Sequence, residues 1–296
     1  MCGIVGLFLK DPALEPELGR LTAAMLATMS DRGPDSAGFA VYGAGERGQT
    51  KLTLRGTSAS AIEDTVAEIE GAFPGVRVTL HDTHAVIALP DQEVEALIKW
   101  LEREAPGTEI VGRGKRMELY KEVGLPTTVA ERFDLAAMRG THAIGHTRMA
   151  TESAVTTDGA HPYSTGKDQC LVHNGSLSNH NNLRRTLKRE GLKFETENDT
   201  EVAAGYLTWR MREGLSLGDA LKVSLDDLDG FYTFVVGTEN GFGVLRDGIA
   251  CKPAVMAETD QYVAFGSEYR VLAGLPGIET ARVWEPEPAT VYFWER

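Results

Sequence analysis

The stretch that most constrains the fold is the first one, which reads Met1-Cys2-Gly3-Ile4-Val5-Gly6-Leu7-Phe8-Leu9. Residues 4–9 are almost entirely apolar, and a short apolar run that ends at a turn is typical of a buried strand. The turn is Asp11-Pro12, because proline punctuates regular structure. The chain is therefore predicted to open with a core strand that has a cysteine at its start.

Cys2 becomes the first residue if the initiator methionine is removed, which its small side chain usually permits. It would then carry both a thiol and a free α-amine. The thiolate is the reactive form of cysteine, with an ordinary pKa of about 8.5, and an α-amine with a pKa of roughly 7.7–8.0 accepts a proton near neutrality. That pairing is the logic of N-terminal nucleophile catalysis, and it fails if Met1 is retained. Taken alone, the stretch favours a buried structural cysteine.

Charge and composition exclude several classes of function. The 296 residues contain 30 Lys and Arg against 43 Asp and Glu, a net charge of −13, which argues against nucleic acid or an anionic membrane as partner. No apolar run approaches the roughly 20 residues that span a bilayer, and no signal peptide is expected. The three cysteines are widely spaced and odd in number, so neither a disulfide framework nor a metal site is predicted. A cytoplasmic protein is expected.

Hydrophobic periodicity predicts mixed α and β structure outside the middle of the chain. An amphipathic helix is predicted over 15–30, where apolar residues recur at spacings of three and four. Further helices are predicted over about 134–138, 179–190, 199–211 and 216–228, the third with Asp199 or Thr200 as N-cap. Strands are predicted over 39–42, 141–147, 169–172, 231–237, 242–246, 249–256, 261–266 and 290–294.

Residues 51–125 have a pattern of their own. From Lys51 the predicted order is strand, helix, strand, strand, helix, strand, which matches a split βαβ, ferredoxin-like unit, and 117–120 can form a further strand. We therefore predict an inserted α+β subdomain over 51–125 and a main domain over 1–50 and 126–296. His81 and His84 lie in the insert, and exposed or hydrogen-bonded loop histidines are favoured over a metal site, because no third ligand is near.

Five short motifs outside the insert carry chemistry. They are Cys2-Gly3-Ile4-Val5-Gly6, Arg32-Gly33-Pro34-Asp35-Ser36-Ala37-Gly38, Gly145-His146-Thr147-Arg148, His173-Asn174-Gly175 and Asn198-Asp199-Thr200-Glu201. In content and order they resemble the glutaminase domain of class II glutamine amidotransferases, over about 1–45 and 140–270. Each has an ordinary structural alternative, such as a hairpin turn at Asn174-Gly175, but all five alternatives together would require independent coincidences.

The resemblance implies a fold and a set of roles. The fold is the α+β, four-layer αββα sandwich of N-terminal nucleophile hydrolases, here with the inserted ferredoxin-like subdomain. Cys2 matches the nucleophile, and Asn174 and Gly175 match the oxyanion hole. Among substrate-binding residues, Arg148 matches the grip on the α-carboxylate of L-glutamine, Asp199 matches the partner of its α-ammonium, and Arg32 matches an arginine that supports the N-terminal site. No cofactor and no metal are implied.

Three positions depart from the family pattern, and one of them, Asn198 where Ser is commoner before Asp-Thr-Glu, should be tolerated. Met149 stands where many members have an aromatic residue, and Glu152 stands where several have His or Asn. Both line the loop over the glutamine site in the family, so they bear on how that loop behaves.

The main domain and its insert consume nearly the whole sequence, and no Walker-type glycine loop is present. We therefore expect a stand-alone glutaminase subunit that feeds ammonia to separate, flavin-binding synthase chains, as in glutamate synthase-like or N-methylglutamate synthase complexes. Three alternatives stay open: an amidase of the same fold with another amide substrate, a non-catalytic regulatory or assembly subunit, and a subunit whose glutaminase activity is vestigial.

Overall fold

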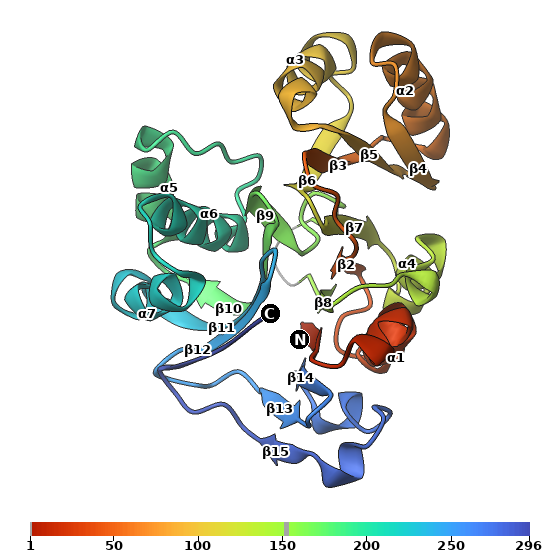
Figure 1. Cartoon of the computed structure of the whole chain (residues 1–296). Helices are drawn as coiled ribbons and strands as arrows, with labels where there is room; N and C mark the ends of the chain where they lie inside the picture. Colours follow the sequence, from red (N-terminus) through yellow and green to blue (C-terminus); the bar gives the residue numbers. More distant parts are fainter. Residues whose placement is uncertain (1, 151–153) are drawn as a thin grey trace.

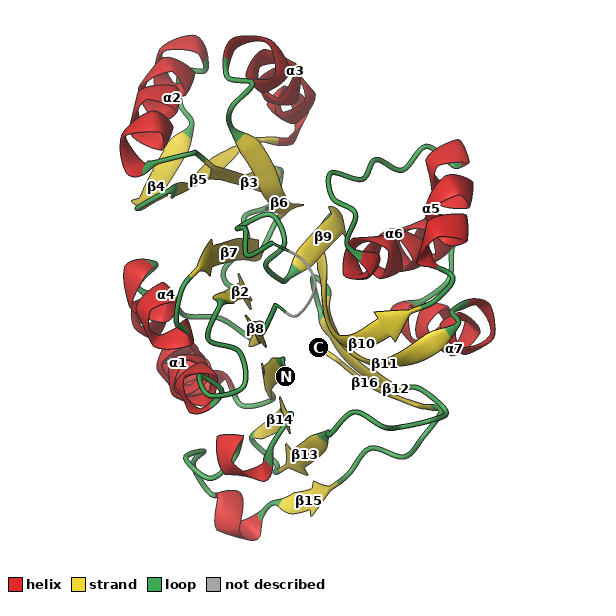
Figure 2. Ribbon diagram, turned by 180° about the vertical axis from the view of Figure 1, so that it is seen from behind, coloured by secondary structure: helices red, strands yellow, loops and turns green. Residues whose placement is uncertain are grey.

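The computed structural model describes residues 2–150 and 154–296. Two β-sheets face each other, and each carries helices on its outer side (Figure 1). A third, smaller sheet with its own pair of helices stands apart from the two main sheets (Figures 1 and 2). This is the predicted four-layer αββα sandwich with an inserted α+β subdomain.

The first main sheet has seven strands, with β1 near its middle. Their order is β15-β13-β14-β1-β8-β2-β7. The bounds are β1 Gly3–Leu9, β2 Ser36–Tyr42, β7 Met117–Val123, β8 His142–Arg148, β13 Val255–Glu258, β14 Tyr262–Gly266 and β15 Arg282–Trp284. Every residue of β1, β2 and β8 is buried, which explains the unbroken apolar run at the start of the chain.

The second main sheet has five strands, in the order β16-β12-β11-β10-β9. The bounds are β9 Tyr163–Gly166, β10 Gln169–Leu177, β11 Gly230–Gly237, β12 Gly241–Arg246 and β16 Thr290–Glu295. Apolar side chains from both sheets, Ile4, Phe8, Val172, Phe242 and Phe265 among them, pack into one core between the sheets. Strand β1 is thus enclosed between the layers.

Helices complete the outer layers, as Figure 2 shows. Helices α1 Leu18–Thr28 and α4 Pro126–Arg132 cover the seven-stranded sheet, and α5 His180–Arg189, α6 Asp199–Arg212 and α7 Leu217–Asp227 cover the five-stranded sheet. Each side has its own apolar core. Helix α6 is buried along most of its length and packs on β9 and β10, so its N-terminus is fixed relative to those strands.

The inserted subdomain, defined here as residues 49–114, has the predicted element order. It consists of β3 Gln49–Arg55, α2 Ala59–Ala72, β4 Arg77–His81, β5 His84–Pro90, α3 Val94–Glu104 and β6 Glu109–Gly114. The strand order β4-β5-β3-β6, with antiparallel pairs throughout, is that of a ferredoxin-like sheet. Both helices pack on one face of this sheet around a separate core.

Some predicted elements differ in the structure. The strand predicted over 117–120 is β7, which pairs with β2 in the seven-stranded sheet, so the four-stranded sheet ends at Gly114. The helix predicted over 134–138 is only a 3₁₀ turn, and the true helix α4 precedes it and begins at Pro126. Proline favours the first turn of a helix, which is the signal that the apolar pattern alone does not contain.

The histidine prediction in the insert is also wrong in part. His81 and His84 pair with each other across the β4–β5 hairpin and are not loop residues. His84 is fully buried against Phe133, and burial lowers its pKa to about 3. It is therefore a neutral core residue.

Asp168 joins the inserted subdomain to the main sheets. Its buried carboxylate accepts backbone N–H bonds from Lys115 (2.7 Å), Arg116 (2.8 Å) and Met117 (3.0 Å), at the turn between β6 and β7. Its own N–H donates to the carbonyl of Arg113 at 2.8 Å. These four hydrogen bonds to Asp168 join the β6–β7 turn to the β9–β10 turn.

We expect an Asp168→Ala variant to lose about 3 kcal/mol or more of unfolding free energy, because it leaves N–H groups without an acceptor. Asp168→Asn should lose less, since it keeps one carbonyl oxygen and tolerates the positive φ of 51° at this position. Urea denaturation of the three proteins measures the difference. A loss below about 0.5 kcal/mol in the alanine variant, typical of plain surface positions, would contradict this role.

Candidate functional site

A small cavity opens at the ends of the two main sheets. Its volume is about 260 Å³, at the small end of ligand pockets. The lining residues come from six separate stretches of chain: Cys2, Arg148, Met149, His161, His173, Asn174, Gly175, Asn198, Asp199, Thr200 and Lys252. Of the residues predicted for the site, only Arg32 is absent from this lining.

Cys2 and Arg148 are brought together by strand register. Gly3 pairs with Thr147 in the antiparallel ladder between β1 and β8, so the residues that flank this pair, Cys2 and Arg148, lie side by side at one end of these two central strands. The Cys2 Sγ is 3.9 Å from the carbonyl oxygen of Met149. Removal of Met1 and the departure at Glu152 both concern residues outside the described part of the chain.

Two side chains hold the backbone of Cys2. The carbonyl oxygen of Cys2 accepts from Arg32 Nε at 3.0 Å and from Asn174 Nδ2 at 3.2 Å. Arg32 is 9% exposed and is paired with Glu268 at 2.8 Å. This arrangement fixes the backbone of Cys2, and it places Arg32 behind Cys2 instead of in the cavity.

Asn174 and Gly175 come from the opposite sheet. They lie inside β10, paired with Thr233 and Tyr232 of β11. The alternative prediction of a hairpin turn at this dipeptide is therefore wrong. Gly175 has φ +148°, and a Cβ there would lie 2.0 Å from the carbonyl oxygen of Phe231. Only glycine fits this position.

Asp199 is the first residue of α6. The N-cap is Asn198, whose side chain accepts from the Thr200 N–H at 2.8 Å, so the prediction of Asp199 or Thr200 as N-cap is wrong. One Asp199 oxygen accepts from the Leu177 N–H at 2.9 Å, and the other lies 3.6 Å from His173 Nδ1. Burial alone would raise the pKa of Asp199, but these contacts and the nearby His180 outweigh burial and lower the pKa to about 2.

A buried histidine cluster behind Asp199 was missed by the sequence analysis. The Thr200 hydroxyl lies 2.7 Å from His161 Nε2 and 2.9 Å from His173 Nδ1, and His161 stacks on His146 with ring centroids 4.1 Å apart. Burial lowers the pKa of His146 to about 3 and the pKa of His161 well below its ordinary value. The rings of His146 and His161 are therefore neutral.

Two charged residues near the site also escaped prediction. Lys252 lines the cavity, with its ammonium 5.1 Å from the ring centroid of Phe231. Glu268 orients Arg32 from the other end of the chain. Both lie in loops after the last recognisable motif, and local sequence offers no signal for either.

The other two cysteines are placed differently from Cys2. Cys170 is fully buried beside the Tyr42 hydroxyl, and burial raises the pKa of its thiol to about 12. Cys251 is exposed and next to Lys252. Of the three, Cys2 alone lines the cavity within the described chain.

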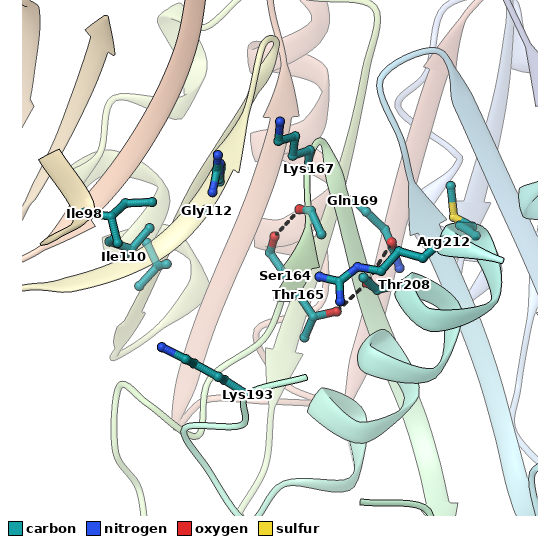
Figure 3. Close-up of a pocket in the computed structure, with 14 residues that line it drawn as sticks. Ile98, Ile110, Gly112, Ser164, Thr165, Lys167, Gln169, Lys193, Thr208 and Arg212 are labelled. Carbon is teal, nitrogen blue, oxygen red and sulfur yellow. Dashed lines mark hydrogen bonds between the residues drawn. The ribbon is translucent and has the colours of Figure 1, made fainter. Parts of the chain in front are cut away.

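A larger cavity, of about 610 Å³, lies between the inserted subdomain and helix α6. Figure 3 shows the Arg212 side chain extending from α6 toward Ser164 and Thr165 of β9. Two basic residues that line this cavity, Arg113 and Lys193, are paired with Glu95 (2.9 Å) and Glu102 (3.7 Å), respectively. Among the described residues, no cysteine and none of the predicted site residues line it, so it is not the candidate active site.

No group of three or more His, Cys, Asp or Glu side chains suited to a metal occurs within residues 2–150 and 154–296. In the same ranges, the helices are all too short or too polar to cross a bilayer.

The low pKa of Asp199 predicts a pH-dependent contribution to stability. In the folded protein the pKa of Asp199 is about 2, which is below the ordinary aspartate value of about 3.9. The ionised group therefore stabilises the fold above pH 4, and this contribution is lost as the pH falls from about 4 toward 2. We expect the stability advantage of the wild type over Asp199→Asn to shrink by roughly 2 kcal/mol across that range.

Urea denaturation at pH 6 and at pH 3 measures that advantage, and about half of the contribution of the ionised carboxylate should be lost at pH 3. Asp226→Asn, which changes an exposed carboxylate on α7, is the matched control and should show a smaller pH effect. An advantage that stays constant between the two pH values would contradict the assignment.

The layers and the site together define a class. An αββα sandwich with a cysteine at the start of a central strand, facing an Asn-Gly pair on the opposite sheet, is the arrangement of N-terminal nucleophile hydrolases.

Comparison with known proteins narrows the class. The family model "Glutamine amidotransferase domain" matches residues 146–274. The chain is 62% identical to the glutamine amidotransferase-like protein GlxB of Rhizobium meliloti, covering all of this chain and 98% of that protein. It is 34% identical, over the full length of both, to a putative glutamine amidotransferase of Methanothermobacter thermautotrophicus.

The fold is shared with a solved structure of greater length. The glutamine phosphoribosylpyrophosphate amidotransferase from B. subtilis superposes with a TM-score of 0.63 at 21% identity, covering 99% of this chain and 47% of that one. The chain thus spans about half the length of that protein. The chain belongs to the class II glutamine amidotransferases, enzymes whose nucleophile is an N-terminal cysteine.

Proposed function

We propose that Cys2 hydrolyses the side-chain amide of L-glutamine. The thiolate attacks the amide carbon, and the carbonyl electrons move onto oxygen. When this intermediate collapses, the carbon–nitrogen bond breaks and ammonia leaves with a proton from the Cys2 ammonium. Water, deprotonated by the Cys2 amine, then attacks the thioester, and glutamate and the thiolate are released. The observation that carries the proposal is the convergence of Cys2, Asn174, Gly175, Arg148 and Asp199 on one cavity.

The charges at the cavity suit a free amino acid. Arg148 and Asp199 line both the 260 Å³ cavity and an adjoining space of about 500 Å³, so they stand where the two meet. A guanidinium fork matches a planar carboxylate, and the low pKa of Asp199 keeps it negative for an ammonium. In this proposal, Arg148 binds the α-carboxylate of glutamine and Asp199 binds its α-ammonium.

Asn174 and Gly175 supply the oxyanion hole in this proposal. The Asn174 amide has two N–H groups, and one is engaged by the Cys2 carbonyl at 3.2 Å. The other N–H, with the backbone N–H of Gly175, is directed in this proposal at the developing oxyanion. Arg32 supports the site indirectly, because its described contacts are with the Cys2 carbonyl and Glu268.

We further propose that the ammonia passes to a separate, flavin-binding synthase subunit of the glutamate synthase or N-methylglutamate synthase type. Two relatives are matched over 98% and 100% of their own length, so this size of chain recurs without an attached synthase in those proteins. Because the mechanism needs Cys2 as a free thiol, a reducing cytoplasm is the proposed location.

The experiment is purification from native cells with any bound partners, followed by a glutamate and ammonia assay with glutamine. Intact mass should show a chain that lacks Met1, and a diazoketone analogue of glutamine should add once, at Cys2. A chain that lacks Met1, keeps its partners and gains no adduct would rule out the catalytic proposal.

A further inference from the structure

The segment 154–161, between β8 and β9, lies against Arg148. The Ala154 carbonyl accepts from Arg148 Nη1 at 3.5 Å, and a Cβ on Gly159 would lie 2.8 Å from the same nitrogen. His161, at the end of the segment, lines the catalytic cavity. The segment therefore contacts the Arg148 guanidinium directly.

A buried lysine holds the segment in place. Lys121 of β7 is 6% exposed, and its ammonium donates to the carbonyl oxygens of Asp158 and Ala160, each at 3.2 Å. It also lies 4.6 Å from the ring centroid of Tyr163, whose hydroxyl donates to the Asp158 carbonyl at 2.9 Å. A buried ammonium is retained only where hydrogen bonds offset its desolvation, and here both carbonyl acceptors belong to one turn.

Two more side chains tie the same turn to neighbouring elements. Glu122, next to Lys121, accepts from the Thr157 hydroxyl. Arg55, on β3 of the inserted subdomain, pairs with the Asp158 carboxylate and with Glu109 at 2.7 Å. Side chains of strand β7 and of the inserted subdomain thus both bind the 157–160 turn.

We propose that Lys121 is a positioning residue for glutamine binding, which holds the 157–160 turn so that Arg148 meets the α-carboxylate, with Arg55 and Glu122 as secondary ties. This inference rests on the proposed function. It gives the inserted subdomain a part in substrate affinity, because Arg55 of β3 reaches the turn directly. Lys121 does not touch the reacting atoms, so its loss acts on glutamine binding and leaves the nucleophile intact.

The test compares Lys121→Met and Thr157→Val with a matched control, Lys51→Met, in a Cys251→Ser background. Lys51 is also partly buried and joins β3 to β7 through Glu118 at 2.5 Å, but within the described chain it is not paired with the 154–161 segment. We measure KM and kcat for glutamine, the rate at which iodoacetamide alkylates Cys2, and the protection that glutamine gives against alkylation.

Lys121→Met should raise KM about tenfold or more, as expected for loss of charge-assisted hydrogen bonds, and Thr157→Val about threefold. The alkylation rate and kcat should stay near wild type, and Lys51→Met should leave KM unchanged. Unchanged KM and protection in both test variants, or an equal rise in Lys51→Met, would overturn the inference. A wild type that binds but does not hydrolyse glutamine would refute the proposed function alone, since protection still reports on Lys121. No protection in the wild type would refute both.

Discussion

A Cys2→Ala variant should lose at least about 10⁴-fold in glutamine hydrolysis, because removal of a nucleophile leaves only binding and oxyanion contributions. The fold should persist, since the residue lies just before the start of β1 and the hydrogen bonds to its backbone carbonyl, from Arg32 and Asn174, do not involve the thiol. Hydrolysis is measured as glutamate released from glutamine.

The assembled complex separates catalysis from structure. With the proposed synthase partners present, Cys2→Ala should abolish synthesis from glutamine and leave synthesis from added ammonia intact. Cys251→Ser, at the exposed cysteine, is the control and should keep both activities. If the Cys2→Ala complex loses both activities, Cys2 has a structural role.

An Asn174→Ala variant should lower kcat by roughly 10²–10³-fold, the usual cost of one oxyanion-hole donor, with a smaller change in KM. The substrate's charged groups are assigned to Arg148 and Asp199, so glutamine binding in the ground state depends little on the Asn174 side chain. Steady-state kinetics with glutamine give both constants.

Because Asn174 also donates to the Cys2 carbonyl, a displaced nucleophile must be distinguished from a lost oxyanion donor. Alkylation of Cys2 by iodoacetamide forms no oxyanion, so its rate should be unchanged in Asn174→Ala. Asn181→Ala, at an exposed position on α5, is the matched control. A kcat within about threefold of wild type would be inconsistent with an oxyanion role of this size.

Much of the fold was predictable because local patterns match local structure. The apolar run after Cys2 is β1, and the element order from Lys51 onward is the ferredoxin-like insert. Some predictions failed where a neighbour far along the chain decides the outcome. Residues 117–123 form a strand as 117–120 were expected to, but their pairing with β2 is a matter of register that no local period contains.

The same distinction between local pattern and distant neighbours applies to the candidate site. Residue types and their order identified Cys2, Arg148, Asn174, Gly175 and Asp199, since each motif lies on a contiguous stretch. Lys252, His161 and Glu268 were not identified, because each reaches the site from a loop without a motif. Lys121 was also missed, since the two carbonyls it binds lie 37 and 39 residues away.

The sequence by itself determined that a thiol begins the first core strand and that an Arg, an Asn-Gly pair and an Asp follow in the order of the family. Only the tertiary structure decided how these groups meet. Strand register sets Arg148 beside Cys2, the facing of two sheets brings Asn174 and Gly175 across from it, and contacts at the start of α6 keep Asp199 ionised. The physical reason is that residue type fixes the chemistry of each side chain. The distances between side chains, and their pKa values, depend on neighbouring residues, most of which lie far away in sequence.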